Sequence, residues 1–378
     1  MLKNPSPCFD RLSMSGSPPR FHWAFPLALC LSKGVPSSFQ HPARQGGRVS
    51  SVPERRKGLR RRLSRNSHRL RRRRRAWKNA AIFALVRSAL WLLDRLSLEQ
   101  ALRLGDRIGD VMYVTFRGTR QLACEHLQLA FGDSLSVPAR ERIIRASFRN
   151  ILRCACEVAK FDAICERLDD YVVADGWEHV EAVLAEGRGG IVITGHIGNW
   201  EILGAYCARR GVPVAAIARR VHNARINDLI VRFRERHGVR TILQENPRSS
   251  REIREVLRAR GLLAMVIDQD MRAPSVSVPF FGRMGRTPAA AAALAVRRHL
   301  PVLPAFAQRQ PGGGHRLTFL PAIRVEGSGD RRRDILDLTR RFTEILEARI
   351  RMNPAERVWW HRWRRSPDPQ LDLDAGLP

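Results

Sequence analysis

IVITGHIGNWE, at residues 191–201, is the most informative stretch of this chain. Its first four residues, Ile191 to Thr194, are all β-branched and predict a short buried strand. Gly195 ends that strand and a helical pattern begins at Asn199, so His196 is expected in the turn between them. Such a turn presents side chains and the unpaired N–H groups of the helix start to a ligand. The stretch therefore predicts a strand–turn–helix unit with a candidate functional histidine.

Strands and helices alternate around this unit. Further strands are expected at 171–174, 212–217, 238–243, 262–267, 302–308 and 315–320, and helices at 177–185, 201–210, 223–237, 251–260, 287–299 and 333–351. The alternation predicts an α/β layered domain with a largely parallel central sheet flanked by helices. Residues 76–168 show helical patterns only, so an N-terminal helical region is expected before the sheet.

The positive charge of the chain is concentrated near its start. The 378 residues have a formal net charge of +31, of which residues 1–75 contribute +17, from 19 Lys and Arg against 2 Asp and Glu. This Pro-, Ser-, Gly- and Arg-rich segment is expected to be a disordered basic arm, or upstream sequence translated from a misassigned start. The excess charge favours an anionic partner, such as a membrane surface, an acidic carrier protein or nucleic acid.

Residues 76–96 are expected to form an amphipathic, membrane-associating helix. Trp77 and Trp91 stand among many apolar residues that Lys78, Arg87 and Asp94 interrupt. Trp side chains anchor such helices at a membrane interface. A helix that packs on the core fits the same pattern, and no run of 18 uncharged apolar residues predicts a spanning helix.

His196 is the candidate catalytic base. Glu201 follows about one helical turn later, and a nearby carboxylate can fix the tautomer of an imidazole and stabilise its cation. The pair suggests transfer chemistry on a hydroxyl without a nucleophilic Ser or Cys. A hydrogen-bonded structural histidine is the alternative, because H-x-x-x-x-E alone is a short pattern.

Polar clusters also follow two other predicted strands, where open α/β sheets place ligands. Arg219, Asn223 and Arg234 follow the strand at 212–217, and arginines there can hold a phosphate or an oxyanion unless they are simply solvated. Asp268 and Gln269 follow the strand at 262–267. These residues are too few for a metal site, and the seven scattered cysteines form no zinc pattern, so neither metal nor cofactor is expected.

Two blocks rich in aromatic residues are the remaining candidates for a functional role. Phe281 and Arg283 belong to VPFFGR at 278–283, where the phenylalanines line an acyl-chain pocket or belong to the core. The block VWWHRWRR at 358–365 interleaves aromatic residues with arginines, as sites at a membrane interface or around an anionic ligand do.

With these blocks in order, the chain resembles the lipid A biosynthesis (late) acyltransferases, within the lysophospholipid acyltransferase group. The matching blocks are HIGNWE at 196–201, the segment at 219–234, DQD at 268–270, VPFFGR with Thr287, and WWHRWRRSP at 359–367. The resemblance covers roughly residues 77–367. It implies one acyltransferase domain at 76–367, with its α/β core at 169–367 and a tail at 368–378.

The resemblance implies that an acyl chain passes from an acyl carrier protein thioester, or acyl-CoA, to a sugar hydroxyl of a membrane glycolipid. The expected acceptor is a lipid A precursor, at the cytoplasmic face of the bacterial inner membrane. His196 and Glu201 match the family's His/acid pair, Arg234 its functional arginine and Asp268 a further important aspartate. The residues expected to bind substrate are Asn199, Arg219, Asn223, Asp268, Gln269, Phe281 and Arg283.

In the expected mechanism, His196 takes the proton of the acceptor hydroxyl as that hydroxyl attacks the thioester. Glu201 orients the imidazole, and Arg234, the N–H groups near Gly198, or both stabilise the oxyanion. One alternative is an acyltransferase for a phosphoinositide mannoside or a lysophospholipid. Another is a non-enzymatic basic protein that binds anionic membrane or nucleic acid, although no RNA-binding pattern indicates a specific nucleic acid partner.

Overall fold

A computed structural model describes residues 54–269 and 274–360, with side chains from residue 72 onward. The helices are α2 (Glu54–Asp94), α3 (Leu98–Thr115), α4 (Arg117–Phe131), α5 (Val137–Ala159), α6 (Phe161–Glu166), α7 (Leu168–Tyr171), α8 (Trp177–Ala185), α9 (Trp200–Arg209), α10 (Ala224–Arg236), α11 (Ser249–Arg258), α12 (Ala290–Arg298) and α13 (Arg331–Met352), with 3-10 turns η1 (Gly132–Ser134) and η2 (Pro354–Glu356). The strands are β1 (Val172–Asp175), β2 (Gly190–Thr194), β3 (Val214–Ala218), β4 (Val239–Leu243), β5 (Leu262–Val266), β6 (Ser275–Phe280), β7 (Arg283–Pro288), β8 (Val302–Arg309) and β9 (His315–Phe319).

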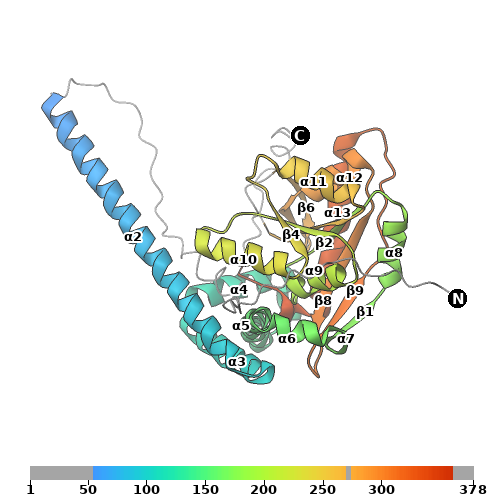
Figure 1. Cartoon of the computed structure of the whole chain (residues 1–378), viewed down its shortest axis with the longest axis horizontal. Coiled ribbons are helices and arrows are strands. Elements are labelled where there is room, and N and C mark those ends of the chain that lie inside the picture. Colours follow the sequence, from blue (N-terminus) through green and yellow to red (C-terminus); the bar gives the residue numbers. More distant parts are fainter. Residues whose placement is uncertain (1–53, 270–273, 361–378) are drawn as a thin grey trace, which may run out of the picture.

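The described residues contain a central seven-stranded sheet in the order β1-β9-β8-β2-β5-β3-β4. Its neighbouring strands pair in parallel except β8 and β9, which are antiparallel. The prediction of an α/β domain with a mostly parallel sheet flanked by helices is therefore confirmed (Figure 1).

The core lies on both faces of this sheet. Val192 packs with residues of α8, α9 and α10, whereas Ile191 and Ile193 pack with residues of α11, α12 and α13. The side chains of β2 alternate between the two faces because successive residues of a strand point to opposite sides of the sheet. Helices cover both faces, so every residue of β2 is buried, which is why this strand is apolar throughout.

Strands β6 and β7 form a separate antiparallel hairpin that the sequence analysis missed. Phe280 pairs with Arg283 across a two-residue turn, in which Phe281 and Gly282 have φ of 50° and 69°. Positive φ at both turn residues is typical of the tight hairpin turn that matches strand twist. Thr287, predicted at the start of a helix, instead lies in β7, and α12 begins at Ala290.

Helix α2 extends further toward the N-terminus than predicted. Residues 54–75 were expected to be disordered, but they form the first part of one helix that continues to Asp94. Arg and Leu, which are frequent in this segment, have high helix propensity, and Pro53 immediately precedes the helix. Residues 1–53 of the predicted arm, and the tail at 368–378, lie outside the described residues.

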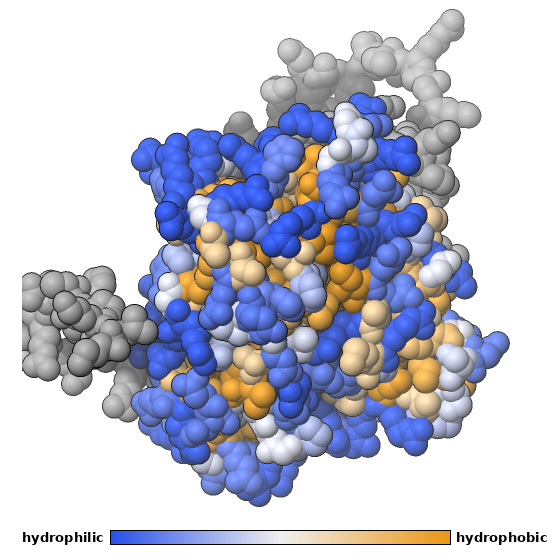
Figure 2. All heavy atoms as spheres, turned by 90° about the vertical axis from the view of Figure 1, so that its right-hand side faces the viewer, coloured by the Kyte–Doolittle hydropathy of each residue, from blue (hydrophilic) through white to orange (hydrophobic). Residues whose placement is uncertain are grey.

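Apolar side chains are exposed on the projecting helix α2. Trp77 is 78% exposed and Trp91 60%, on the side of the molecule where α2 extends from the α/β core (Figure 1). The face on the opposite side of the molecule is mostly hydrophilic, and polar side chains interrupt its apolar areas (Figure 2). Among the described residues, no helix combines the length and apolarity needed to cross a bilayer.

Candidate active site

Strand register brings His196 and Asp268 together. Thr194 ends β2 beside Val266, which ends the neighbouring parallel strand β5. His196 and Asp268 each follow these paired residues by two positions. Because parallel strands end at the same edge of a sheet, both side chains meet at its carboxyl edge, where α/β folds place ligands.

The imidazole of His196 is held by the carboxylate of Asp268. The Nδ1–Oδ1 distance is 2.7 Å, and the same oxygen accepts the backbone N–H of His196 at 3.0 Å. An ionised carboxylate only accepts hydrogen bonds, so the proton lies on Nδ1 and Nε2 is the basic ring nitrogen. The His196 side chain is 15% exposed and that of Asp268 is 1% exposed, so the imidazole reaches the surface while its carboxylate partner is shielded.

Two further residues flank the imidazole. The side-chain amide of Gln269 lies 2.8 Å from Nδ1, next to the contact with Asp268. The Trp200 ring meets the imidazole edge to face, with 4.8 Å between ring centroids. Both neighbours restrict rotation of the imidazole. Gln269, predicted to bind substrate, thus lies at the site itself.

Glu201 does not take the predicted place beside the imidazole. Its carboxylate forms a two-pronged ion pair with Arg234, at 2.6 and 2.9 Å, and accepts the Nε1–H of Trp200 at 3.1 Å. Glu201 and Arg234 are both buried. The expected position of Glu201 is therefore corrected: Asp268 contacts His196, while Glu201 joins α9 to α10 and accepts a hydrogen bond from Trp200. Nε and Nη2 of Arg234 both donate to Glu201, and the predicted role of Arg234 at an oxyanion stays a prediction.

The turn after His196 is enclosed by two distant segments, α5 and η2. Gly198 has φ of 59°, and a Cβ atom there would lie 1.7 Å from the carbonyl oxygen of Ala307, so only glycine fits. Its N–H donates to the carbonyl of Glu356 at 3.2 Å, and its carbonyl accepts the Cys154 thiol at 3.4 Å. The Gly198 N–H, an expected oxyanion donor, is thus already bonded.

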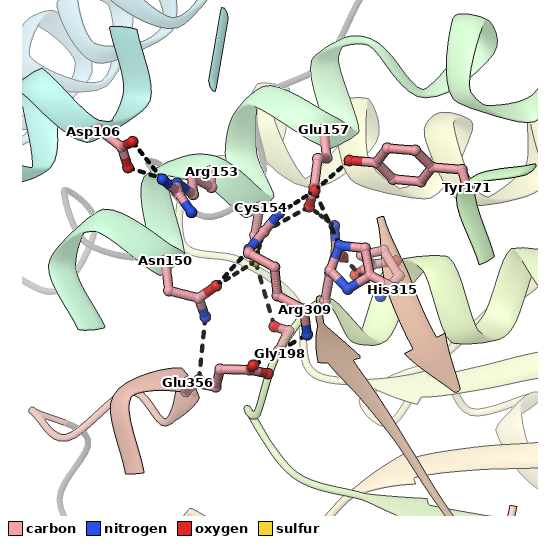
Figure 3. A network of polar contacts seen from close by, with 12 residues as sticks. Asp106, Asn150, Arg153, Cys154, Glu157, Tyr171, Gly198, Arg309, His315 and Glu356 are labelled. Atoms are coloured by element: carbon pink, nitrogen blue, oxygen red, sulfur yellow. Dashed lines mark hydrogen bonds and ion pairs between the residues drawn. The ribbon is translucent and has the colours of Figure 1, made fainter. Parts of the chain in front are cut away.

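Glu157 of α5 is the centre of the buried polar network behind this turn (Figure 3). Its carboxylate accepts hydrogen bonds from Arg309, His315 and Tyr171, and from the side-chain amide of Asn199 at 2.9 Å. Burial alone raises the pKa of Glu157, but His315 and Arg309 outweigh it and hold that pKa well below its ordinary value. The network fixes Asn199 and, through it, the turn that bears His196.

Two asparagines predicted to bind substrate make hydrogen bonds within the protein. Asn199 is 2% exposed, and its Oδ1 accepts the N–H of Glu201 at 3.3 Å as the cap of α9. The Asn223 amide donates to the carbonyl of Asn79 at 2.9 Å and so joins the start of α10 to α2. The short polar side chains that favour substrate binding are also those that cap helices.

The other predicted residues lie apart from the His196–Asp268 contact. Arg219 is exposed and pairs with Glu245 at 3.5 Å. Phe281 is buried and packs against Phe131 and Trp359, so it belongs to the core. Arg283 is exposed at the start of β7.

Sequence reasoning missed Glu157 and Arg309, which the fold brings together across 152 positions. The one local sign was a glutamate inside the otherwise apolar run at 154–159. Of the predicted C-terminal block, residues up to 360 are described, and Val358 donates its N–H to the His196 carbonyl at 3.3 Å. In the described residues, no cluster of three or more His, Cys, Asp or Glu could hold a metal ion.

Comparisons with known proteins identify the family of this chain. The model of the bacterial lipid A biosynthesis acyltransferase family matches residues 70–365. A phosphatidylinositol mannoside acyltransferase of Mycobacterium tuberculosis (strain ATCC 25618 / H37Rv) is 25% identical over 281 residues, 72% of this chain and 85% of the relative. One of Mycolicibacterium smegmatis is 25% identical over 222 residues, 58% of this chain and 70% of the relative.

Among solved structures, the 1-acyl-sn-glycerophosphate acyltransferase of Thermotoga maritima aligns with a TM-score of 0.28 and 15% identity, over 65% of this chain and 98% of that one. The family match extends over most of the sequence and includes every element that builds the site. The chain therefore belongs to the bacterial lipid A biosynthesis acyltransferase family and is an acyltransferase.

Proposed function

We propose that this acyltransferase transfers a fatty acyl chain from a thioester of acyl carrier protein or CoA to a sugar hydroxyl of a membrane glycolipid. The observation on which the proposal rests is the His196–Asp268 contact at the carboxyl edge of the sheet. A partly exposed imidazole whose Nδ1–H is held by a shielded carboxylate is suited to remove a proton from a hydroxyl.

In the proposed reaction, Nε2 of His196 takes the proton of the acceptor hydroxyl as its oxygen attacks the thioester carbonyl. Asp268 stabilises the imidazolium that forms. The tetrahedral intermediate then breaks the carbon–sulfur bond, and the imidazolium returns its proton to the departing thiolate. The products are an ester and a thiol. A thioester is already activated, so no acyl-enzyme is required.

Glu201 and Arg234 act indirectly in this proposal. Their ion pair joins α9 to α10, and the Nε1–H bond to Glu201 fixes Trp200, whose ring meets the imidazole. Both are positioning residues for His196. Arg219 and Arg283, which are exposed, are proposed to contact the anionic donor or acceptor.

The proposed acceptor is a glycolipid. A lipid A precursor follows from the family, and a phosphatidylinositol mannoside is the second candidate, because the two curated relatives described above are named as acyltransferases for it. Both are anionic glycolipids with free sugar hydroxyls.

The exposed tryptophans of α2 and the basic charge of the chain support action at an anionic membrane surface. We propose that this surface is the cytoplasmic face of the bacterial inner membrane.

Transfer of a radiolabelled acyl chain tests this proposal. The full-length protein is given acyl carrier protein and CoA thioesters as donors, and a Kdo-bearing lipid A precursor, a phosphatidylinositol mannoside or a lysophospholipid as acceptor. Labelled glycolipid is expected from the wild type. We expect His196→Ala to abolish transfer, and Asp268→Asn to lower kcat by about 10²–10⁴-fold, because the amide fails to stabilise the imidazolium.

Three results would contradict the proposal. Substantial transfer by folded His196→Ala protein would remove His196 as the base. Label in the lysophospholipid alone would move the acceptor outside the glycolipids. Anionic-membrane or nucleic-acid binding without transfer from any donor would favour the non-enzymatic alternative.

A further inference from the structure

Arg357 is a buried cation directly behind the catalytic turn. Arg357 is 1% exposed, and its backbone forms an antiparallel bridge with Ile197, the neighbour of His196. The guanidinium lies over the rings of Phe280 and Trp359, with its carbon 4.9 and 5.0 Å from the ring centroids. The mechanism above gives this residue no role.

Part of the Arg357 guanidinium lacks the hydrogen bonds that a buried arginine usually makes. Among the described residues, neither its Nε nor its Nη1 has a hydrogen-bond partner. An isolated buried cation is strongly disfavoured, and contact with aromatic faces offsets only part of that cost. A nearby negative charge is needed to keep it there.

Asp268 provides that negative charge. Burial lowers the pKa of Arg357, and the carboxylate of Asp268 opposes the decrease. Asp268 in turn holds His196. Asp268 accepts the backbone N–H of His196, and Arg357 pairs with the next residue, Ile197, so both charged residues are attached to the same turn.

We propose that Arg357 is a positioning residue whose charge balances Asp268 and weakens the hold of the His196–Asp268 pair on its proton. A positive charge nearby disfavours the protonated pair, whichever member carries the proton. Arg357 therefore keeps more of His196 in its basic form, so that it can accept the hydroxyl proton.

Other charged groups near the turn must be separated from this effect. Glu356 lies beside Gly198, and burial raises the pKa of its carboxyl to about 7. Glu157 and Arg309 form the closed ion pair of the Figure 3 network. Arg349 acts on Glu356 and contacts Gln308 and Thr318, away from His196.

The pH dependence of kcat/KM tests the proposal, comparing the wild type with Arg357→Met, Arg357→Lys and Arg349→Met. Met has a similar volume, and apolar replacement of a buried charge is often tolerated. We expect Arg357→Met to move the acid limb upward by about one pH unit and to keep activity on the alkaline plateau. Arg357→Lys should leave the limb near that of the wild type, and Arg349→Met should not move it.

The alternatives give different profiles. A purely structural Arg357 would lower activity at every pH without moving the limb, and this result would overturn the proposal. Equal shifts in Arg357→Met and Arg349→Met would assign the limb to Glu356 and would also overturn it.

The pH profile rests on the proposed function. A second measurement, of stability, does not depend on it. Urea unfolding is followed for the wild type, Asp268→Asn, Arg357→Met and the double variant. Asp268→Asn leaves Arg357 buried without a counter-charge, so its midpoint should fall well below that of the wild type, whereas the same change in the Arg357→Met background should cost much less. Equal decreases in both backgrounds would show that the two charges are not coupled and overturn the proposal, even if transfer activity proves absent.

Discussion

The two carboxylates predicted near His196 make separate contacts. Asp268 contacts the imidazole, and Glu201 pairs with Arg234, with side chains 7% and 9% exposed. Burial alone lowers the pKa of Arg234, but the charge of Glu201 outweighs it and raises that pKa. We expect Glu201→Gln to lower the free energy of unfolding by about 3–5 kcal/mol, because it leaves the Arg234 cation buried without its partner.

Chemical denaturation measures this loss, and the double variant Glu201→Gln/Arg234→Met is its control. Neutralising both partners should recover most of the stability, because no buried charge remains unpaired. If Glu201→Gln abolished transfer while stability stayed at the wild-type value, Glu201 would act at the reacting atoms and not through Trp200.

At the residue scale, the sequence located His196 but not its partner. The strand, the glycine and the following helix can be recognised within eleven residues. Glu201 was chosen because it is close along the chain, whereas Asp268 is 72 positions away. Their meeting depends on β2 and β5 being neighbours, which is a property of the sheet order and cannot be derived from local patterns. His196 and Asp268 were nonetheless both among the residues predicted for the site.

Among the secondary-structure elements, η2 anchors the turn that bears His196 through the bond from the Gly198 N–H to the Glu356 carbonyl. Its Glu356 accepts the N–H of Arg309 at 3.0 Å and the amide of Asn353 at 2.7 Å. Because burial raises its pKa from 4.5 to about 7, the folded protein binds this proton more tightly than the unfolded chain does. The resulting stability is complete below pH 4.5 and is lost as the pH rises through about 7.

We therefore expect Glu356→Gln to remove this pH dependence. Between pH 5 and 8, the wild type should lose about 2–3 kcal/mol more unfolding free energy than the variant does. Thermal or urea unfolding at several pH values measures the difference. Glu99→Gln, on the exposed surface of α3, is the matched control and should follow the wild type. Parallel curves for wild type and Glu356→Gln would contradict a buried proton on Glu356.

Most sheet elements could be predicted because each has its own periodicity. The strands of the central sheet and helices α8 to α11 were located within a few residues of their observed bounds. The β6–β7 hairpin was missed because its turn, Phe281-Gly282, lies inside an apolar block that resembles a pocket lining. The start of α2 was missed because a dense positive charge suggested disorder, although arginine is also a good helix former.

At the scale of the whole molecule, α2 divides its apolar residues between the core and the exterior. Val86, Leu90 and Leu93 are buried, whereas Trp77, Leu85, Trp91 and Leu92 are 46–78% exposed. With 3.6 residues per turn, the two sets lie on opposite sides of the helix. An apolar side with tryptophans, next to arginines, is suited to the interface of an anionic membrane.

We expect the double variant Trp77→Glu/Trp91→Glu to bind vesicles that contain anionic lipid at least about tenfold more weakly than the wild type, since it replaces two apolar anchors with charges. Vesicle co-sedimentation measures binding, and added salt should weaken the wild type as screening reduces its attraction to the lipid. Val173→Glu is the matched control, because Val173 is 50% exposed on β1 of the α/β core, away from α2 (Figure 1). Unchanged binding by the double variant, or an equal loss in Val173→Glu, would exclude α2 as the membrane-facing element and place the approach to the glycolipid on another surface.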